Sequence, residues 1–303
     1  MEIRVALMEG IARLRQAGTP SHTLAAELLL MHALGRDRTW LYTHPESSVE
    51  PDAEEKYFAF IARRVSGEPT QYITGKQEFW GLEFEVSPAV LIPRPETEHV
   101  MEVALELLGP RGLKIEMASG KPSDPLLIAD VGTGSGCLAV ALAWELPHAE
   151  IIATDISAAA LEVARRNAAR HHVADRIHFQ QTNLLENVSV PPSATNRGPR
   201  CFDLIVSNPP YIGTADAATL PREVRDHEPH AALFAGHTGA EMYPKLIEQA
   251  GRRLRPGGIL AIELGYSSLD RVLPMLDTPP HWTQLRVTND LAGIPRVLSA
   301  VRL

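Results

Sequence analysis

The chain has little cysteine, no excess of basic charge and no long apolar run. Its 303 residues include only two cysteines, Cys137 and Cys201, which form no Cys-x-x-Cys pair. A zinc cluster and a disulfide framework therefore lack ligands. Acidic residues outnumber basic ones by 37 to 29, so the overall field, with a net charge of −8, does not attract nucleic acid. The most apolar early run, residues 24–34, contains Glu27 and is too short to span a bilayer.

The first residues also lack a basic segment followed by an apolar one, which argues against a signal peptide. We therefore expect a cytoplasmic protein in a reducing compartment, with no membrane contact. The remaining composition, 45% hydrophobic and 22% charged, is typical of globular proteins. The length is that of about two domains.

Residues 1–75 are predicted to form a small all-helical domain. Apolar residues recur there at helical spacing, Ser21 is a suitable N-cap for the second helix, and no catalytic pattern occurs. This composition is typical of a packing or recognition domain. Four short helices are expected, around residues 3–14, 24–31, 37–42 and 57–65.

The periodicity changes after residue 75. Leu82, Phe84 and Val86 alternate with acidic residues, as in a strand, and residues 79–81 suggest a hairpin turn. A proline-stiffened loop, residues 93–96, follows the hairpin and opens a helix over residues 96–108. Residues 76–98 are therefore predicted to be a β-hairpin and loop that connect two domains.

Short apolar runs alternate with helical segments from about residue 125 to the end. This alternation predicts an α/β fold in which residues 99–303 form a doubly wound, mostly parallel sheet. We expect residues 118–125 and 188–199 to be surface insertions. Strands are expected at residues 126–131, 151–153, 177–180, 204–207, 259–264 and 297–303, and further helices at 137–144, 158–171, 242–254 and 269–276.

A glycine-rich loop follows the first of these strands, where the ligands of doubly wound sheets bind. It contains Gly132, Gly134 and Gly136, and the next strand ends in Asp155, whose carboxylate is suited to ribose hydroxyls. The nicotinamide fingerprint requires a Gly or Ala where Cys137 stands. The loop therefore favours S-adenosyl-L-methionine over a nicotinamide dinucleotide.

A second motif, Asn208-Pro209-Pro210-Tyr211, follows the strand over residues 204–207. Its prolines lack N–H groups, so the turn offers acceptors, the Asn208 side-chain oxygen and the Pro209 carbonyl, to both hydrogens of a planar NH2 group. Such a grip orients the nitrogen lone pair and stabilises the positive charge that grows during methylation. Tyr211 is expected to cover the flat face of the substrate.

Together these motifs resemble those of the PrmC/HemK family, protein-(glutamine-N5) methyltransferases within the class I, Rossmann-like methyltransferases that use S-adenosyl-L-methionine. The resemblance covers nearly the whole chain. It rests on the N-terminal helices, the hairpin, and the sequence motifs at residues 91–98, 132–136, 208–211 and 228–229. It implies a seven-stranded Rossmann-like sheet and methylation of the glutamine in the Gly-Gly-Gln motif of class 1 peptide-chain release factors. It also implies a monomer with no metal and no direct contact to nucleic acid, whose N-terminal domain recognises the substrate protein.

The family's residue roles are carried over to matching positions. The resemblance implies that Asn208, Pro209 and Tyr211 are catalytic, that Pro210 completes the substrate grip, and that Arg94 and Glu96 shape the substrate pocket. Asn183 and Leu184, at the adenine, depart from the acidic and aromatic residues found in other members. The implied cofactor-binding residues are Asp130, Gly132, Thr133, Gly134, Ser135, Gly136, Asp155, Ile156, Asn183, Leu184 and Asn208.

Two other functions remain open from the sequence. Adenine-N6 methylation of DNA or RNA uses the same tetrapeptide, because adenine also presents a planar NH2 group, but the net charge of −8 argues against it. The fold could also serve as a binding scaffold without catalysis. Three loop histidines, at positions 227, 230 and 237, are interpreted as solvated side chains rather than metal ligands.

Overall fold

The computed structural model describes two compact units. Unit 1 comprises Met1–Lys76 and Leu220–Glu228, and unit 2 comprises Gln77–Thr219 and Pro229–Leu303. Most of the two expected insertions, residues 118–125 and 188–199, lies outside the described part of the chain. The described residues are 1–114, 125–191, 202–277 and 282–303, without the side chains of 110–114.

Unit 1 consists of short helices around one apolar core. The four predicted helices are confirmed, while α5 and α9, five and six residues long, were not predicted because they contain no apolar repeat. Buried residues of α1, α2 and α4, including Leu14, Leu29 and Tyr57, form the core. The helices are α1 (Ile3–Gln16), α2 (His22–Leu34), α3 (Arg38–Thr43), α4 (Pro51–Val65), α5 (Thr70–Thr74) and α9 (Arg222–His227).

The predicted capping role of Ser21 is wrong. Ser21 precedes α2, but its φ of 49° is left-handed and its side chain accepts no capping hydrogen bond. A side-chain cap requires an extended backbone at this position. Asp37 has that conformation and caps α3 by accepting a 2.7 Å hydrogen bond from Trp40 N.

The predicted hairpin is formed by β1 (Lys76–Phe79) and β2 (Leu82–Glu85). Its two turn residues, Trp80 and Gly81, have φ values of 55° and 71°. Left-handed conformations at both central positions match the twist of the flanking strands. The chain then passes through a loop to the short helix η1 (Pro95–Thr97).

Unit 2 contains a seven-stranded sheet with the order β5-β4-β3-β6-β7-β9-β8. Strands β3 to β7 are parallel, and β9 is antiparallel to both of its neighbours, which confirms the mostly parallel, doubly wound prediction. The strands are β3 (Leu126–Val131), β4 (Ala149–Asp155), β5 (Ile177–Gln181), β6 (Phe202–Ser207), β7 (Leu254–Glu263), β8 (Trp282–Asn289) and β9 (Pro295–Arg302).

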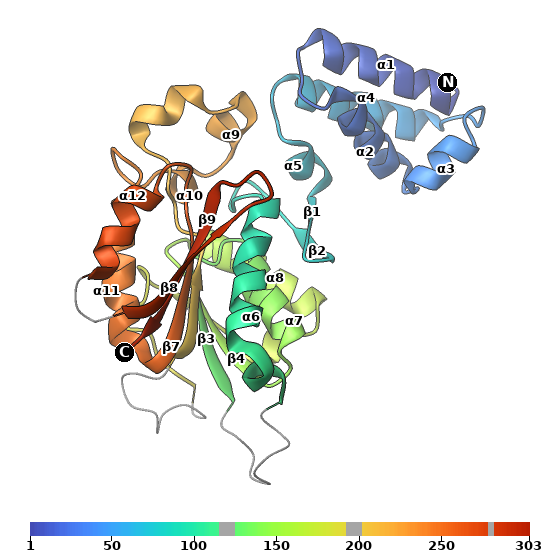
Figure 1. Ribbon diagram of the computed structural model, residues 1–303. Coiled ribbons are helices and arrows are strands. Elements are labelled where there is room, and N and C mark those ends of the chain that lie inside the picture. The colour runs from blue at the N-terminus through green and yellow to red at the C-terminus, as the bar shows by residue number, and fades with distance from the viewer. Residues whose placement is uncertain (115–124, 192–201, 278–281) are drawn as a thin grey trace. The chain divides into compact units, whose positions relative to one another are not determined.

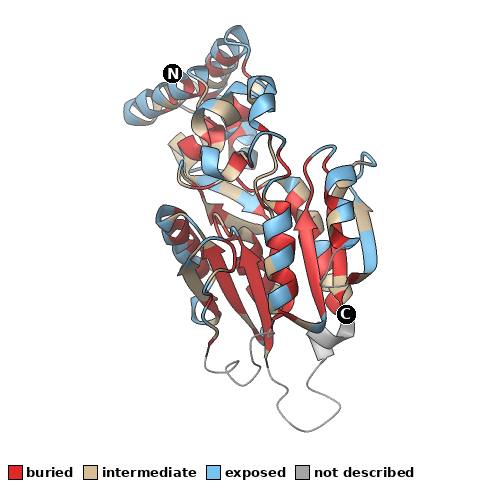
Figure 2. Ribbon diagram, turned by 90° about the vertical axis from the view of Figure 1, so that its left-hand side faces the viewer, coloured by how far each residue is buried: buried red, intermediate tan, exposed pale blue. Residues whose placement is uncertain are grey.

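Helices cover both faces of this sheet (Figure 1). One apolar core lies between the sheet and α6 (Glu98–Lys114), α7 (Cys137–Glu145) and α8 (Ala158–Arg170). The other lies between the sheet and α11 (Tyr243–Arg253), α12 (Leu269–Val272) and η5 (Leu273–Asp277). Strands β3, β4, β6, β7 and β9 are buried along most of their length (Figure 2). Shorter helices are η2 (Ala174–Arg176), η4 (Thr214–Thr219) and α10 (His230–Leu233).

The backbone of α6 is kinked at Gly109, whose φ of 55° lies outside the helical region. Within the ranges that the structure describes, no helix combines the length and apolar character needed to cross a bilayer.

Candidate functional site

The order of the strands places a crevice beyond the ends of β3 and β6. The chain runs outward from β3 through β4 to β5 and then returns to β6, on the other side of β3. Ligands of doubly wound sheets bind at such a reversal. Val131 and Ser207 are register partners at the two strand ends, and the Ser207 hydroxyl donates a 2.6 Å hydrogen bond to the Val131 carbonyl. The glycine loop and Asn208 therefore begin side by side.

A cavity of about 450 Å³ occupies this crevice. Most of its wall is apolar, as in sites that enclose small organic ligands, and a few polar groups converge on it. The wall includes most of the residues predicted from the sequence: Asp130, Gly132, Thr133, Gly134, Ser135, Asp155, Ile156, Asn183, Leu184, Asn208, Pro209 and Pro210. Gly136, Tyr211, Arg94 and Glu96 are not among the wall residues.

The glycine loop is held to β4 by backbone hydrogen bonds. The N–H groups of Gly132 and Thr133 both donate to the Thr154 carbonyl, at 2.9 and 2.8 Å. Gly134 has a φ of 56°, which favours glycine. At Gly136 a side chain is excluded, because an added Cβ would lie 3.0 Å from Ala164 Cβ and the φ is 81°. The loop thus lies tightly against β4 and α8.

Asp130 is buried at the base of the glycine loop. Its Oδ2 accepts hydrogen bonds from Thr133 Oγ1 at 2.6 Å and Ala139 N at 3.1 Å. Its Oδ1 is buried and accepts none from the described residues. Burial raises the pKa of Asp130 to about 7. The free acceptor is suited to a ligand that carries N–H donors or positive charge.

Asp155, at the end of β4, also lies in the wall. Its two oxygens accept 2.9 Å hydrogen bonds from the N–H groups of Ser157 and Gly134. Burial raises its pKa, although these hydrogen bonds oppose the shift. Each oxygen retains a lone pair, so the carboxylate can still accept from hydroxyl groups. Further along the wall, Asn183 is exposed and Leu184 is buried, with a φ of 56°.

Asn208 is fixed by a chain of hydrogen bonds that the sequence does not reveal. Asn208 Nδ2 donates to Thr97 Oγ1 at 2.9 Å, and Thr97 Oγ1 donates to Glu263 Oε2 at 2.7 Å. Thr97 is 1% exposed and Glu263 is fully buried. Burial raises the pKa of Glu263 to about 7. Thr97 lies in η1 and Glu263 ends β7, so three separate segments meet at this point.

Tyr211, expected to cover the substrate, is not among the wall residues. Its ring packs against Gly265, where an added Cβ would lie 2.8 Å from Tyr211 Cδ2, instead of lining the cavity. Its hydroxyl interacts with the Glu263 carboxyl, and burial with this interaction raises the pKa of Tyr211. Arg94 and Glu96 act as nearby charges outside the wall, the first on Tyr211 and the second on Glu263.

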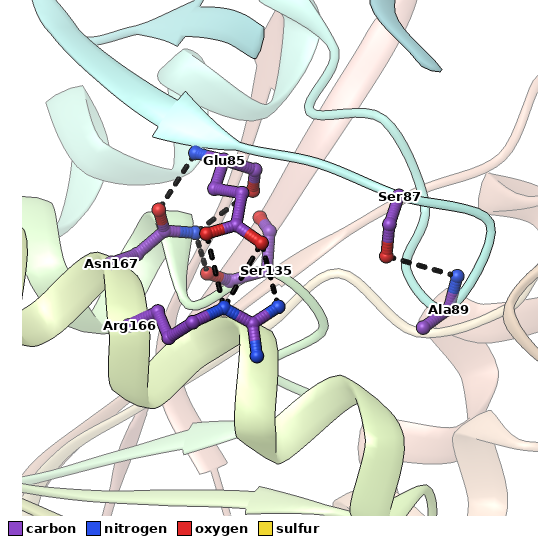
Figure 3. Close-up of polar contacts among 6 residues, drawn as sticks. All are labelled: Glu85, Ser87, Ala89, Ser135, Arg166 and Asn167. Atoms are coloured by element: carbon purple, nitrogen blue, oxygen red, sulfur yellow. Dashed lines mark hydrogen bonds and ion pairs between the residues drawn. The ribbon is translucent and has the colours of Figure 1, made fainter. Parts of the chain in front are cut away.

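A buried amide joins the glycine loop to the hairpin (Figure 3). Asn167 Nδ2 donates to the carbonyls of Ser135 at 2.8 Å and Glu85 at 3.0 Å, and its Oδ1 accepts from Glu85 N at 2.7 Å. Arg166 adds an ion pair with the Glu85 carboxylate at 2.6 Å. The hairpin leads directly into Ala89, which lies in the cavity wall. Asn167 therefore connects two parts of the wall.

Thr97, Glu263 and Asn167 were not predicted as part of the site. Weak signals for them exist in the sequence. Glu263 is the only charged residue in the apolar run 259–264, and Asn167 lies on the otherwise apolar face of α8. Within the described residues, no group of three or more His, Cys, Asp or Glu side chains is arranged to hold a metal ion.

Two regions of the chain match known protein families. Residues 5–75 match the family model of the PrmC N-terminal domain, and residues 121–222 match that of the methyltransferase small domain. A release factor glutamine methyltransferase of Koribacter versatilis is 45% identical over 98% of this chain and 98% of its own length. One of Chlorobaculum tepidum is 44% identical over 92% of this chain and 90% of its own length.

A solved structure shares the fold. The hMettl16 catalytic domain in complex with MAT2A 3'UTR hairpin 1 superposes with a TM-score of 0.54. The match covers 80% of this chain and 80% of that chain, and the identity is 16%. At this identity the likeness shows the fold alone.

Proposed function

The chain belongs to the family of release factor glutamine methyltransferases, and from this premise we propose the atoms that its reaction joins. The protein is a methyltransferase with a Rossmann-like class I fold. The proposed reaction transfers a methyl group from S-adenosyl-L-methionine to the side-chain nitrogen, N5, of the glutamine in the Gly-Gly-Gln motif of class 1 peptide-chain release factors.

The observation that carries this proposal is the shared cavity wall of the glycine loop and Asn208-Pro209-Pro210. The two segments follow neighbouring strands, so a cofactor held by the first lies beside a substrate held by the second. This proximity is the main requirement for a transfer between two bound molecules.

The wall residues fit S-adenosyl-L-methionine. The buried, unpartnered Asp130 Oδ1 is a suitable acceptor for the ammonium group of the methionine part, and Asp155 for the ribose hydroxyls. Asn183 and Leu184 would lie at the adenine, and Ile156, 64% exposed, also lies in the wall. When bound, this cofactor supplies an electrophilic methyl group on a sulfonium.

The Asn208 side chain is proposed to bind and orient the substrate amide group. An amide nitrogen is a poor nucleophile because its lone pair is delocalised. The Asn208 Oδ1 and the Pro209 carbonyl would accept both hydrogens of the glutamine NH2 group and orient its lone pair toward the methyl donor. They would also stabilise the positive charge that develops on nitrogen. No general base is needed first, since the methylated amide loses its proton readily.

The helical unit is proposed to recognise the substrate protein. Residues 5–75 match the PrmC N-terminal domain, and the described residues of this unit contain no part of the cavity wall. A recognition role would leave the chemistry to unit 2. A translation substrate is consistent with a cytoplasmic, monomeric enzyme that does not contact nucleic acid directly.

The proposal is tested by comparing acceptors. The full-length protein is incubated with methyl-labelled S-adenosyl-L-methionine and, separately, a bacterial class 1 release factor, duplex DNA or RNA. We expect label on the release factor only. Label on nucleic acid alone would establish the adenine-N6 alternative, and cofactor binding without transfer to any acceptor would favour a scaffold.

A further inference from the structure

The hydrogen bonds between Asn208, Thr97 and Glu263 have a defined direction. An ionised carboxylate has no hydrogen, so Glu263 Oε2 can only accept, and the 2.7 Å contact must use the single hydrogen of the Thr97 hydroxyl. Thr97 Oγ1 is then left as an acceptor. Its 2.9 Å contact to Asn208 must therefore come from the Nδ2 amino group.

This direction determines which end of the Asn208 amide faces the cavity. With Nδ2 held by Thr97, the Oδ1 oxygen is the free end, and Asn208 lies in the cavity wall. A flipped amide would instead present two N–H donors to the NH2 group of the substrate and would repel it. The chain of hydrogen bonds thus selects the acceptor orientation that the chemistry requires.

We infer that Thr97 and Glu263 are positioning residues, which hold the Asn208 amide with its oxygen toward the substrate. This inference rests on the proposed function, because it assumes that the substrate group is a planar NH2. The same carboxyl also interacts electrostatically with the Tyr211 hydroxyl, at the other end of the tetrapeptide.

The protonation state of Glu263 controls this arrangement. A protonated Glu263 can donate to Thr97, which frees the Thr97 hydrogen for Asn208 Oδ1 and permits the flipped amide. Burial raises the pKa of Glu263 to about 7, so this change falls within the neutral range. The groups that face the Glu263 carboxyl from neighbouring elements are Thr97 and Glu96 in η1, Tyr211 after β6, Cys137 in α7, Tyr243 in α11 and Arg296 in β9.

Substitutions at Thr97 test the positioning role. Thr97→Val keeps the shape and removes the hydroxyl, and we expect it to lower kcat on the order of 10- to 100-fold with KM for the release factor little changed. Thr97→Ser restores the hydroxyl and should remain within about threefold of the wild type. Thr288→Val is the matched control, since the Thr288 hydroxyl is buried without a partner among the described residues and Thr288 lies on β8, outside the cavity wall.

The pH dependence separates this role from a packing role. At saturating cofactor, kcat of the wild type should fall as the pH drops through about 7, whereas Glu263→Gln should lose this acid limb. The inference is overturned if Thr97→Val keeps the wild-type kcat, or if Thr97→Ser is as slow as Thr97→Val. It is also overturned if kcat of Glu263→Gln still falls as the pH drops through about 7, because that fall would then arise from another group such as Asp130.

A measurement that does not require methyl transfer distinguishes a failure of this inference from a failure of the proposed function. Infrared difference spectra of the wild type against Glu263→Gln follow the protonated Glu263 carboxyl as the pH changes. Because Thr97 donates to the charged carboxyl, Thr97→Val should raise the pKa of Glu263. If the release factor is not methylated at all, the proposed function fails, while a raised pKa would still support the hydrogen-bond direction and an unchanged one would overturn it.

Discussion

Asn208 is the residue on which the proposed chemistry depends. Its side chain joins the buried Thr97 on one side and the cavity on the other. The acceptor end acts most strongly when charge develops on the substrate nitrogen, so its loss should affect turnover more than binding. Substitutions at this position therefore separate catalysis from cofactor recognition.

We predict that Asn208→Ala lowers kcat on the order of 10²-fold or more, as the removal of one transition-state hydrogen-bond partner does elsewhere. The affinity for S-adenosyl-L-methionine, measured by calorimetry, should be mostly retained. Asn289→Ala, at an exposed asparagine at the end of β8, serves as the control. An Asn208→Ala variant with the wild-type rate would refute the assigned role.

Single residues were predictable from the sequence where a motif is contiguous. The glycine loop and Asn208-Pro209-Pro210 each follow a recognisable strand, and both lie in the cavity wall. Thr97 and Glu263 could not be found in this way, because 111 residues separate Asn208 from Thr97 and 166 separate Thr97 from Glu263. Tyr211 was assigned to the substrate face; its ring packs against Gly265, and the substrate contact stays a prediction.

One buried side chain of α8 connects the glycine loop to the β-hairpin. Asn167 in α8 hydrogen-bonds both the end of β2 and the Ser135 carbonyl, and it is fully buried. Hydrogen bonds of this kind contribute modestly when made, but unpaired buried groups are costly. The positions of the loop and of the hairpin therefore depend on the same amide.

We predict that Asn167→Ala destabilises the protein by about 2–4 kcal/mol, because it removes the partner of the buried Ser135 carbonyl and of the part-buried Glu85 N–H and carbonyl. It should also weaken cofactor binding, since the Ser135 carbonyl is no longer held. Urea denaturation and calorimetry measure the two effects. Arg166→Ala, at a half-exposed ion pair between the same two elements, should change stability by only about 0–1 kcal/mol. Equal effects of the two substitutions would contradict this account.

Elements with an apolar core face were predicted well, and polar ones were not. β3, β4 and β6 were identified from their apolar runs. β8 was missed because most of its residues are exposed or half-buried, so that no apolar alternation marks it. β7 was predicted to begin at residue 259, but it begins at Leu254 and continues through Pro256-Gly257-Gly258, a sequence typical of turns.

At the scale of the whole molecule, one short segment belongs to a different unit from the residues on either side of it. Leu220–Glu228, which lies between two segments of unit 2, belongs to unit 1. There Glu223 forms an ion pair with Arg64, whose side chain is 6% exposed. A buried cation requires such a partner. The domain ranges proposed from the sequence are contiguous, so they do not group this segment with the N-terminal helices.

The stability of the molecule should depend on pH through Glu263. Its pKa of about 7 in the folded state lies above the value of 4.5 expected when unfolded. Between these values the native state binds more protons, so the contribution of Glu263 to stability is lost as the pH rises toward and past 7. Glu263→Gln has no such dependence. We predict that its free energy of unfolding, relative to the wild type, increases from about pH 5 to pH 8 in urea denaturation.

Other titrating groups, such as His32 with its lowered pKa, contribute equally to both proteins and cancel in this difference. A constant difference across the range would show that Glu263 does not change its protonation there.

The identity of the methylated atom tests the central claim most directly. A class 1 release factor is treated with the full-length protein and S-adenosyl-L-methionine, digested, and mapped by tandem mass spectrometry. We predict one added methyl group, located on the side-chain nitrogen of the glutamine in the Gly-Gly-Gln motif and absent from a release factor in which this glutamine is replaced by glutamate. A methyl group on any other residue, or one that persists after that replacement, would contradict the account.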